Sequence, residues 1–133
     1  MIKRLIYIGI MVLALSSCQQ NIEEVLLSRS DISLTVNGEL QMNYNENSCQ
    51  IGYNPAKNQF RVYNEDLENW FILSCSAKPT SEGQKLKADL DYKTGTTTKN
   101  YKDLEFSVER ISSDGLIWLW NKDKKIGIVV KSL

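Results

Sequence analysis

Three features of the sequence predict an all-β domain. Apolar and polar residues alternate with a period of two in segments of about 5–9 residues, turn residues separate these segments, and no long helical period appears. The segments recur about every 8–15 positions. We therefore expect an antiparallel sandwich or small barrel of about eight or nine strands, following an N-terminal signal helix that is cleaved.

The N-terminal residues have the three parts of a secretory signal peptide. Lys3 and Arg4 give a positive start, residues 5–15 are apolar, and Ser16 and Ser17 are the small residues that a signal peptidase requires near its cut. The apolar run has about 11 residues, whereas a spanning helix needs ~20. A permanent transmembrane helix is therefore not expected.

Leu15-Ser16-Ser17-Cys18 resembles the lipobox of bacterial lipoproteins, in which an apolar and two small residues precede a cysteine. In that family the cysteine sulfur receives a diacylglyceryl group, the preceding peptide is removed and the new amine is usually acylated. The resemblance implies that residues 1–17 are removed and that Cys18 is the acylated N-terminus. Two or more acyl chains anchor a protein stably. The alternative is an ordinary secreted protein in which the cysteine falls here by chance.

Removal of the signal leaves a length that suits one domain. We assign residues 18–30 to a lipidated tether and 31–133 to a single β domain; within the tether, residues 23–27 fit the start of a short helix or of a first strand. Gln19 after the cysteine resembles the outer-membrane sorting signal of enterobacterial lipoproteins. The mature part resembles the small lipoproteins of Bacteroidota. The expected location is the cell envelope, lipid-anchored at the outer membrane, on its periplasmic or surface side.

The first two strands are predicted over residues 32–36 and 40–44, where apolar and polar side chains alternate. Asn37-Gly38 lies between them. A two-residue type I′ turn needs positive φ at both central residues, and Asn-Gly is the pair that adopts it most readily. The sequence therefore predicts an antiparallel hairpin here.

Seven further strands are predicted, over residues 49–54, 59–64, 70–76, 85–92, 104–109, 116–120 and 126–130. Turn and loop residues separate them. The strand over 85–92 alternates apolar residues with lysine and aspartate, so one face is expected in the core and the other in water. Residues 94–100 are expected to form a flexible connection, and the strand over 116–120 is apolar on both faces.

Two cysteines, Cys49 and Cys75, remain in the mature domain besides the anchor. Export into an oxidising compartment favours a disulfide between them. If residues 49–54, 59–64 and 70–76 form a plain meander, however, the cysteines lie at opposite ends of the middle strand, about 17 Å apart. A disulfide requires Cα atoms within ~7 Å. Either the third strand crosses to another sheet, or both thiols are free and buried.

Composition excludes several kinds of chemistry. The chain has no histidine, which excludes histidine acid–base catalysis and histidine metal ligation. It has 16 basic and 16 acidic residues, and loss of Lys3 and Arg4 with the signal leaves 14 basic and 16 acidic residues, a net charge of −2, so nucleic acid is not an expected partner. No phosphate loop, nucleophile motif or metal-ligand cysteine spacing occurs. We expect a non-enzymatic domain without a metal or cofactor.

Aromatic residues are the candidate ligand contacts. Trp70 lies on the opposite face of its strand from Phe71, so it is exposed if the core takes the Phe71 side. Trp118 and Trp120 share one strand face, and the alternative for this pair is a core position under another layer. Exposed tryptophans stack on sugar rings or anchor protein contacts.

These observations favour a membrane-anchored binding or assembly module. Its expected partners are the bilayer, through acylated Cys18, and an envelope protein or glycan. Residues 113–115, followed by Ile117, Trp118 and Lys122, resemble the C-terminal hairpin of lysozyme-inhibitor lipoproteins, which gives an alternative function. A glycan-binding surface lipoprotein is a further alternative, and a carboxylate-based enzyme is least favoured.

Overall fold

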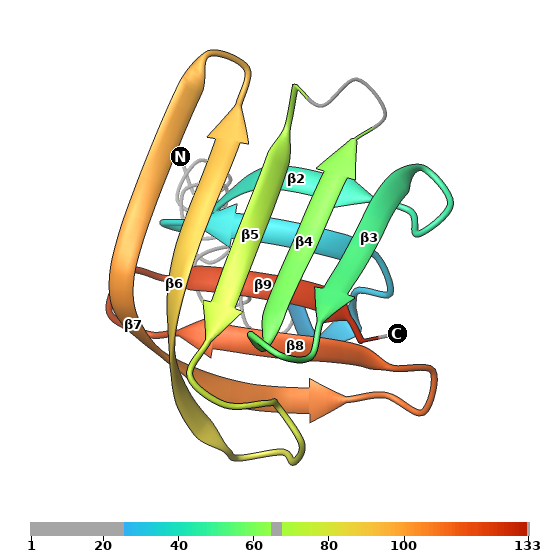
Figure 1. The fold of residues 1–133 in the computed structure, drawn as a ribbon, viewed down its shortest axis with the longest axis vertical. Coiled ribbons are helices and arrows are strands. Elements are labelled where there is room, and N and C mark those ends of the chain that lie inside the picture. The colour runs from blue at the N-terminus through green and yellow to red at the C-terminus, as the bar shows by residue number, and fades with distance from the viewer. Residues whose placement is uncertain (1–25, 65–67, 133) are drawn as a thin grey trace, which may run out of the picture.

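The computed structural model describes residues 26–64 and 68–132. In these ranges nine antiparallel strands form one barrel-like sheet that is nearly closed (Figure 1), which confirms the predicted all-β fold. The predicted signal segment, Cys18 and the first part of the tether lie outside the described residues. The strands are β1 (Ile32–Val36), β2 (Glu39–Tyr44), β3 (Cys49–Asn54), β4 (Gln59–Asn64), β5 (Trp70–Cys75), β6 (Lys85–Thr94), β7 (Thr97–Ile111), β8 (Leu116–Asn121) and β9 (Ile126–Lys131).

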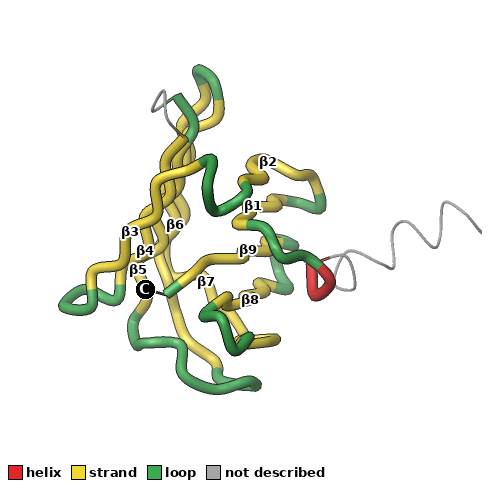
Figure 2. The backbone as a smooth tube through the Cα atoms, turned by 90° about the vertical axis from the view of Figure 1, so that its right-hand side faces the viewer, coloured by secondary structure: helices red, strands yellow, loops and turns green. Residues whose placement is uncertain are grey.

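The strand order is β2-β1-β9-β8-β7-β6-β5-β4-β3. Figures 1 and 2 show β3 to β6 as one layer and β1, β2, β8 and β9 as a second layer that crosses behind it. The long strand β7 curves from the first layer into the second and closes that side of the fold. On the other side β2 and β3 are the two edges of the sheet, so the barrel is open between them.

The Asn37-Gly38 hairpin is confirmed. Both turn residues have positive φ, 54° at Asn37 and 78° at Gly38, as the type I′ geometry requires. β1 and β2 pair on either side of the turn, with a register shift at Leu34/Thr35. Across that shift Leu34 pairs with the buried Met42, whereas Thr35 pairs with Leu40, which is 50% exposed.

The prediction of a flexible connection over residues 94–100 is wrong in its length, because the connection in the structure is much shorter. β6 continues to Thr94, β7 begins at Thr97, and Gly95 turns the chain between them with a φ of 59°. The threonines around the turn, at positions 94 and 96–98, are β-branched and favour extended backbone. Pairing across the hairpin from Thr94↔Thr97 to Asp91↔Asn100 uses their backbone groups.

The core lies between the two layers and consists of aliphatic and aromatic side chains from eight of the nine strands, and partly buried side chains of β3 pack against it. In β8 every residue is buried, which confirms that the strand is apolar on both faces. One helical turn, residues 26–28, covers part of the outer face of this layer. Leu26 packs on Gly127 of β9 and is 3% exposed, so the folded domain extends N-terminally beyond residue 31.

Cys49 and Cys75 are free thiols, so the disulfide expected from export to an oxidising compartment is not formed in the structure. β3, β4 and β5 are a plain meander, in which Cys49 pairs with Asn64 and the backbone N–H of Cys75 donates to Asn58 at 3.0 Å. The cysteines therefore lie at opposite ends of β4. This is the geometry in which both thiols stay free, and Cys75 is buried in the core.

Candidate functional site

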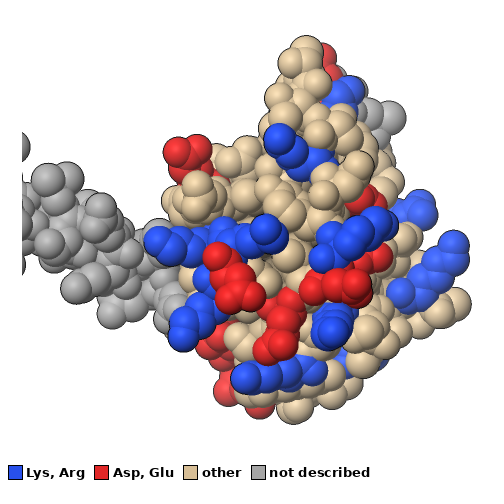
Figure 3. All heavy atoms as spheres, turned by 90° about the vertical axis from the view of Figure 1, so that its left-hand side faces the viewer, with Lys and Arg blue, Asp and Glu red and all other residues tan. Residues whose placement is uncertain are grey.

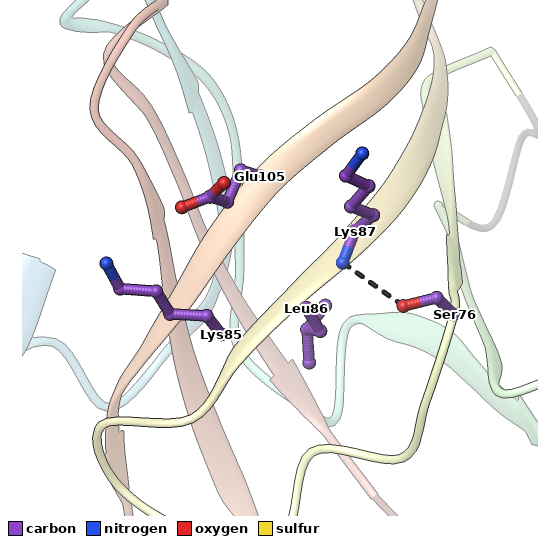
Figure 4. Close-up of a pocket in the computed structure, with 5 residues that line it drawn as sticks. All are labelled: Ser76, Lys85, Leu86, Lys87 and Glu105. Carbon is purple, nitrogen blue, oxygen red and sulfur yellow. Dashed lines mark hydrogen bonds between the residues drawn. The ribbon is translucent and has the colours of Figure 1, made fainter.

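A run of shallow hollows lies along the outer face of the closed side of the barrel. The central hollow has a volume of about 300 Å³ and is lined by Ser76, Lys85, Leu86, Lys87 and Glu105 (Figure 4). A second, also about 300 Å³, shares Lys85 and Glu105 with it and extends to β8. A third, about 290 Å³, shares Ser76 and Lys87 and extends toward β5. The three are contiguous and cross β5 to β8.

Backbone pairing positions the charges of the central hollow. Lys87 lies opposite Glu105 in the β6–β7 register, and Lys85 lies opposite Ser107. Ser76 extends the β5–β6 pairing, because its hydroxyl accepts a hydrogen bond from the Lys87 N–H at 3.1 Å. Figure 4 shows Lys85 and Glu105 extending to the same side of the strand pair.

The charges on this face are mixed and mostly unpaired. Figure 3 shows basic and acidic side chains interleaved over it. Within residues 26–64 and 68–132, the ion pairs are Lys102–Asp89 at 3.6 Å and Lys131–Glu46, so Lys85, Lys87 and Glu105 form none. Such a surface suits a polar partner that carries both signs of charge.

Asp89 lines one end of these hollows and stabilises the backbone of Asp103 on the adjacent strand. Its carboxylate accepts a hydrogen bond from the Asp103 N–H at 3.0 Å, where the β6–β7 register shifts. Asp103 has a φ of 54°, which is unfavourable for a residue with a side chain, so this bond stabilises a strained position. The arrangement gives Asp89 a structural role in the sheet.

The outer face of β4, β5 and β6 carries a second surface, and it includes Trp70. Trp70 is half-buried and pairs with Tyr63 on one side and Lys93 on the other. Phe71 and Leu73 of the same strand face the core, as the alternation predicts. Tyr and Trp are enriched at interfaces, because each combines an apolar ring with a polar group. Tyr63 was not among the predicted contacts, although its alternation with Phe60 and Val62 indicates an outward position.

The other two candidate tryptophans are buried. Trp118 is 2% exposed and Trp120 is 8% exposed. This agrees with the alternative prediction for the pair, a core position under another layer. The guanidinium of Arg110 lies 4.8 Å from the Trp118 ring centroid and donates to the Leu27 carbonyl at 3.0 Å. Arg110 thus joins the helical turn to the Trp118 face and covers that ring. Trp120 contributes to the lining of the second hollow, but it presents only a small part of its surface there.

In ranges 26–64 and 68–132 no group of three or more His, Cys, Asp or Glu side chains is placed to hold a metal ion. No helix there is both long and apolar enough to cross a membrane. No protein-family model matches the chain, and neither a curated protein nor a solved structure matches it.

Proposed function

We propose that this protein is a lipid-anchored lipoprotein of the cell envelope, delivered to the outer membrane, whose β domain binds an envelope partner without catalysing a reaction. The observation that carries the proposal is the lipobox-like sequence ending at Cys18, placed after a short apolar run. Core side chains of the described residues occupy the space between the two layers, so we place the binding surface on the outer face of the sheet.

Metabolic labelling tests the anchor. Cells that express the full-length chain are given a palmitate analogue, and the protein should become labelled. Cys18→Ala should abolish the label, whereas the matched variant Cys49→Ala should retain it, because Cys49 lies inside the folded domain. Label on the Cys18→Ala protein would exclude the proposed anchor.

Glycan binding is the ligand class that the Trp70 surface favours. Tyr63 and Trp70 are cross-strand neighbours on an outward face, and both are half-buried, so their rings are partly accessible. A sugar ring can stack on the exposed face of such an aromatic ring without a deep pocket. This candidate is a refinement of the envelope-binding proposal.

Tryptophan fluorescence tests it. Titration with envelope and host polysaccharides should shift the emission of the wild-type protein, and Trp70→Ala should remove the shift. Leu40→Ala, on the edge strand β2 and away from Trp70, is the matched control and should leave it unchanged. Equal responses from wild type and Trp70→Ala would exclude the Trp70 surface.

A further inference from the structure

No strand among the described residues pairs with the outer edge of β3. β3 is the last strand of the sheet order and pairs with β4 in an uninterrupted register from Cys49↔Asn64 to Asn54↔Gln59. Its sequence, CQIGYN, contains no charged residue and no proline. Edge strands ordinarily carry charges, prolines or bulges that prevent pairing with another chain. The opposite edge has such features, since β2 contains Glu39 and lies across the β1–β2 register shift.

The hydrogen bonds of β4 show which groups of β3 are free. In β4 the Asn58 side of the strand faces β5, because the Asn58 carbonyl accepts from Cys75 and the Asn64 N–H donates to Asn69 at 3.1 Å. The odd-numbered residues of β4 therefore face β3, where they pair with Asn54, Gly52 and Gln50.

It follows that the N–H and C=O groups of Cys49, Ile51 and Tyr53 point to the free edge. No backbone or side-chain group among residues 26–64 and 68–132 bonds them. The side chains of these three residues are also only half-buried, whereas Phe60 and Val62 on the adjacent strand are 1% and 0% exposed. Figures 1 and 2 show β3 at the rim of its layer, beside the opening of the barrel.

We propose that this edge is a homodimer interface, in which β3 pairs antiparallel with β3 of a second copy of the chain. The register places Ile51 opposite Ile51 of the second copy and Cys49 opposite Tyr53. This register pairs every free N–H and C=O of the three residues and continues the inner face of one sheet into that of the other. A two-fold axis relates the copies, as in most homodimers.

The charges at the two ends of β3 favour a second copy as the occupant. Antiparallel pairing places the turn that precedes β3, with Glu46, beside the turn that follows β3 in the other copy, with Lys57, and the two-fold axis creates this contact twice. Glu46 is exposed and also forms an ion pair with Lys131 of its own chain. Lys57 is exposed and forms no ion pair with a described residue. Between these ends the strand is uncharged, so no like charges oppose each other across the interface.

Disulfide trapping in the full-length chain tests the register. Cys49→Ser and Cys75→Ala are introduced first, and Ile51→Cys is added to that parent. Residues that exchange backbone bonds across antiparallel strands have Cα atoms about 5.5 Å apart, which is within disulfide reach. Mild oxidation of cells should therefore give a covalent dimer. Leu40→Cys in the same parent is the matched control, on the other edge, and should give no more dimer than the parent, which retains Cys18.

A proline variant tests the hydrogen bonds. The Ile51 N–H faces the free edge, so Ile51→Pro removes no β3–β4 bond but removes both central bonds of the dimer. The dimer of the detergent-extracted protein should weaken by about tenfold or more in sedimentation, with unchanged far-UV circular dichroism. Lys57→Glu, at an exposed turn, should weaken the dimer without any change in the strand.

Two outcomes would overturn the proposal: a wild-type protein that is monomeric at micromolar concentration, or equal disulfide trapping at positions 40 and 51. Neither outcome depends on acylation.

Discussion

Gly127 determines how the start of the folded domain docks on the barrel. A Cβ atom at this position would lie 2.9 Å from Leu26 Cδ1, closer than real Cβ atoms approach, and 3.0 Å from Cδ2, which is a tight contact. The absence of a side chain on Gly127 therefore lets Leu26 pack against β9. Arg110, through the Leu27 carbonyl, holds the same turn.

We predict that Gly127→Ala lowers the free energy of unfolding by about 1–3 kcal/mol, because the added methyl group displaces Leu26. Chemical denaturation measures the change. Gly52→Ala is the matched control: its nearest contact would be Arg61 Cβ at 3.9 Å, an ordinary separation, so a small effect is expected. Leu26→Ala combined with Gly127→Ala should lose less than the sum of the single changes. Equal effects at positions 52 and 127 would contradict the packing argument.

Cys75 gives a pH dependence of stability. Burial raises the pKa of the Cys75 thiol to about 12, whereas a thiol in an unfolded chain titrates near ~8.5. Between these values the folded chain keeps a proton that the unfolded chain has lost, so the free energy of unfolding falls as the pH rises. The full contribution is present below pH ~8.5.

Denaturation at pH 7.5 and at about pH 9.8 measures this effect. Wild type should lose roughly 1–2 kcal/mol more over this interval than Cys75→Ala, since each pH unit is worth ~1.4 kcal/mol per proton. Burial and Tyr101 also raise the pKa of Tyr92 to about 12, but that contribution is common to both proteins. Identical losses in the two proteins would show that Cys75 does not stay protonated in the folded state.

At the residue scale, alternation in the sequence predicted the face of each side chain better than its exposure. It placed Trp70 opposite Phe71, and the structure agrees. For Trp118 and Trp120 it left two alternatives open, because what covers the outer face of β8 is a turn near the N-terminus that the strand pattern does not describe. The outcome for the cysteines followed from the meander register, which outweighs the expectation from the compartment.

At the element scale, the β1–β2 turn is where sequence and backbone geometry correspond most directly. Gly38 has a φ of 78°, which L side chains rarely adopt. We predict that Gly38→Ala destabilises the protein by about 1–2 kcal/mol. Asn37→Gly is the control and should be close to neutral, because glycine also adopts the φ of 54° found there. Thermal unfolding of both variants measures the difference; a neutral Gly38→Ala would contradict the type I′ turn.

The strands themselves were predictable because each has a period of two and a turn signal at its end. The β6–β7 hairpin was misjudged at its tip, where polar threonines carry no alternation to mark them as strand. The register shift between β6 and β7 at Asp103 could not be predicted from the sequence either. The positive φ of Asp103 depends on a hydrogen bond to the Asp89 side chain on the adjacent strand. Features of this kind depend on partners that are distant in the sequence.

At the scale of the whole molecule, the sequence predicted the fold class but not how the sheet closes. Nine short antiparallel strands fit either a sandwich or a barrel, and the choice rests on the curvature of β7 and on β1 pairing with β9. Among the described residues, that closure leaves β3 as an edge strand and the outer faces of the sheet as surfaces for a partner. Both proposals for binding therefore follow from the topology and not from a motif.

The anchor is the central claim, and it is tested most directly by mass spectrometry of the mature protein from the cell envelope. The account predicts an N-terminal peptide that begins at Cys18 and carries a diacylglyceryl group on sulfur and an acyl chain on its amine. A mature chain that begins at another residue, or one that retains residues 1–17, would contradict the account.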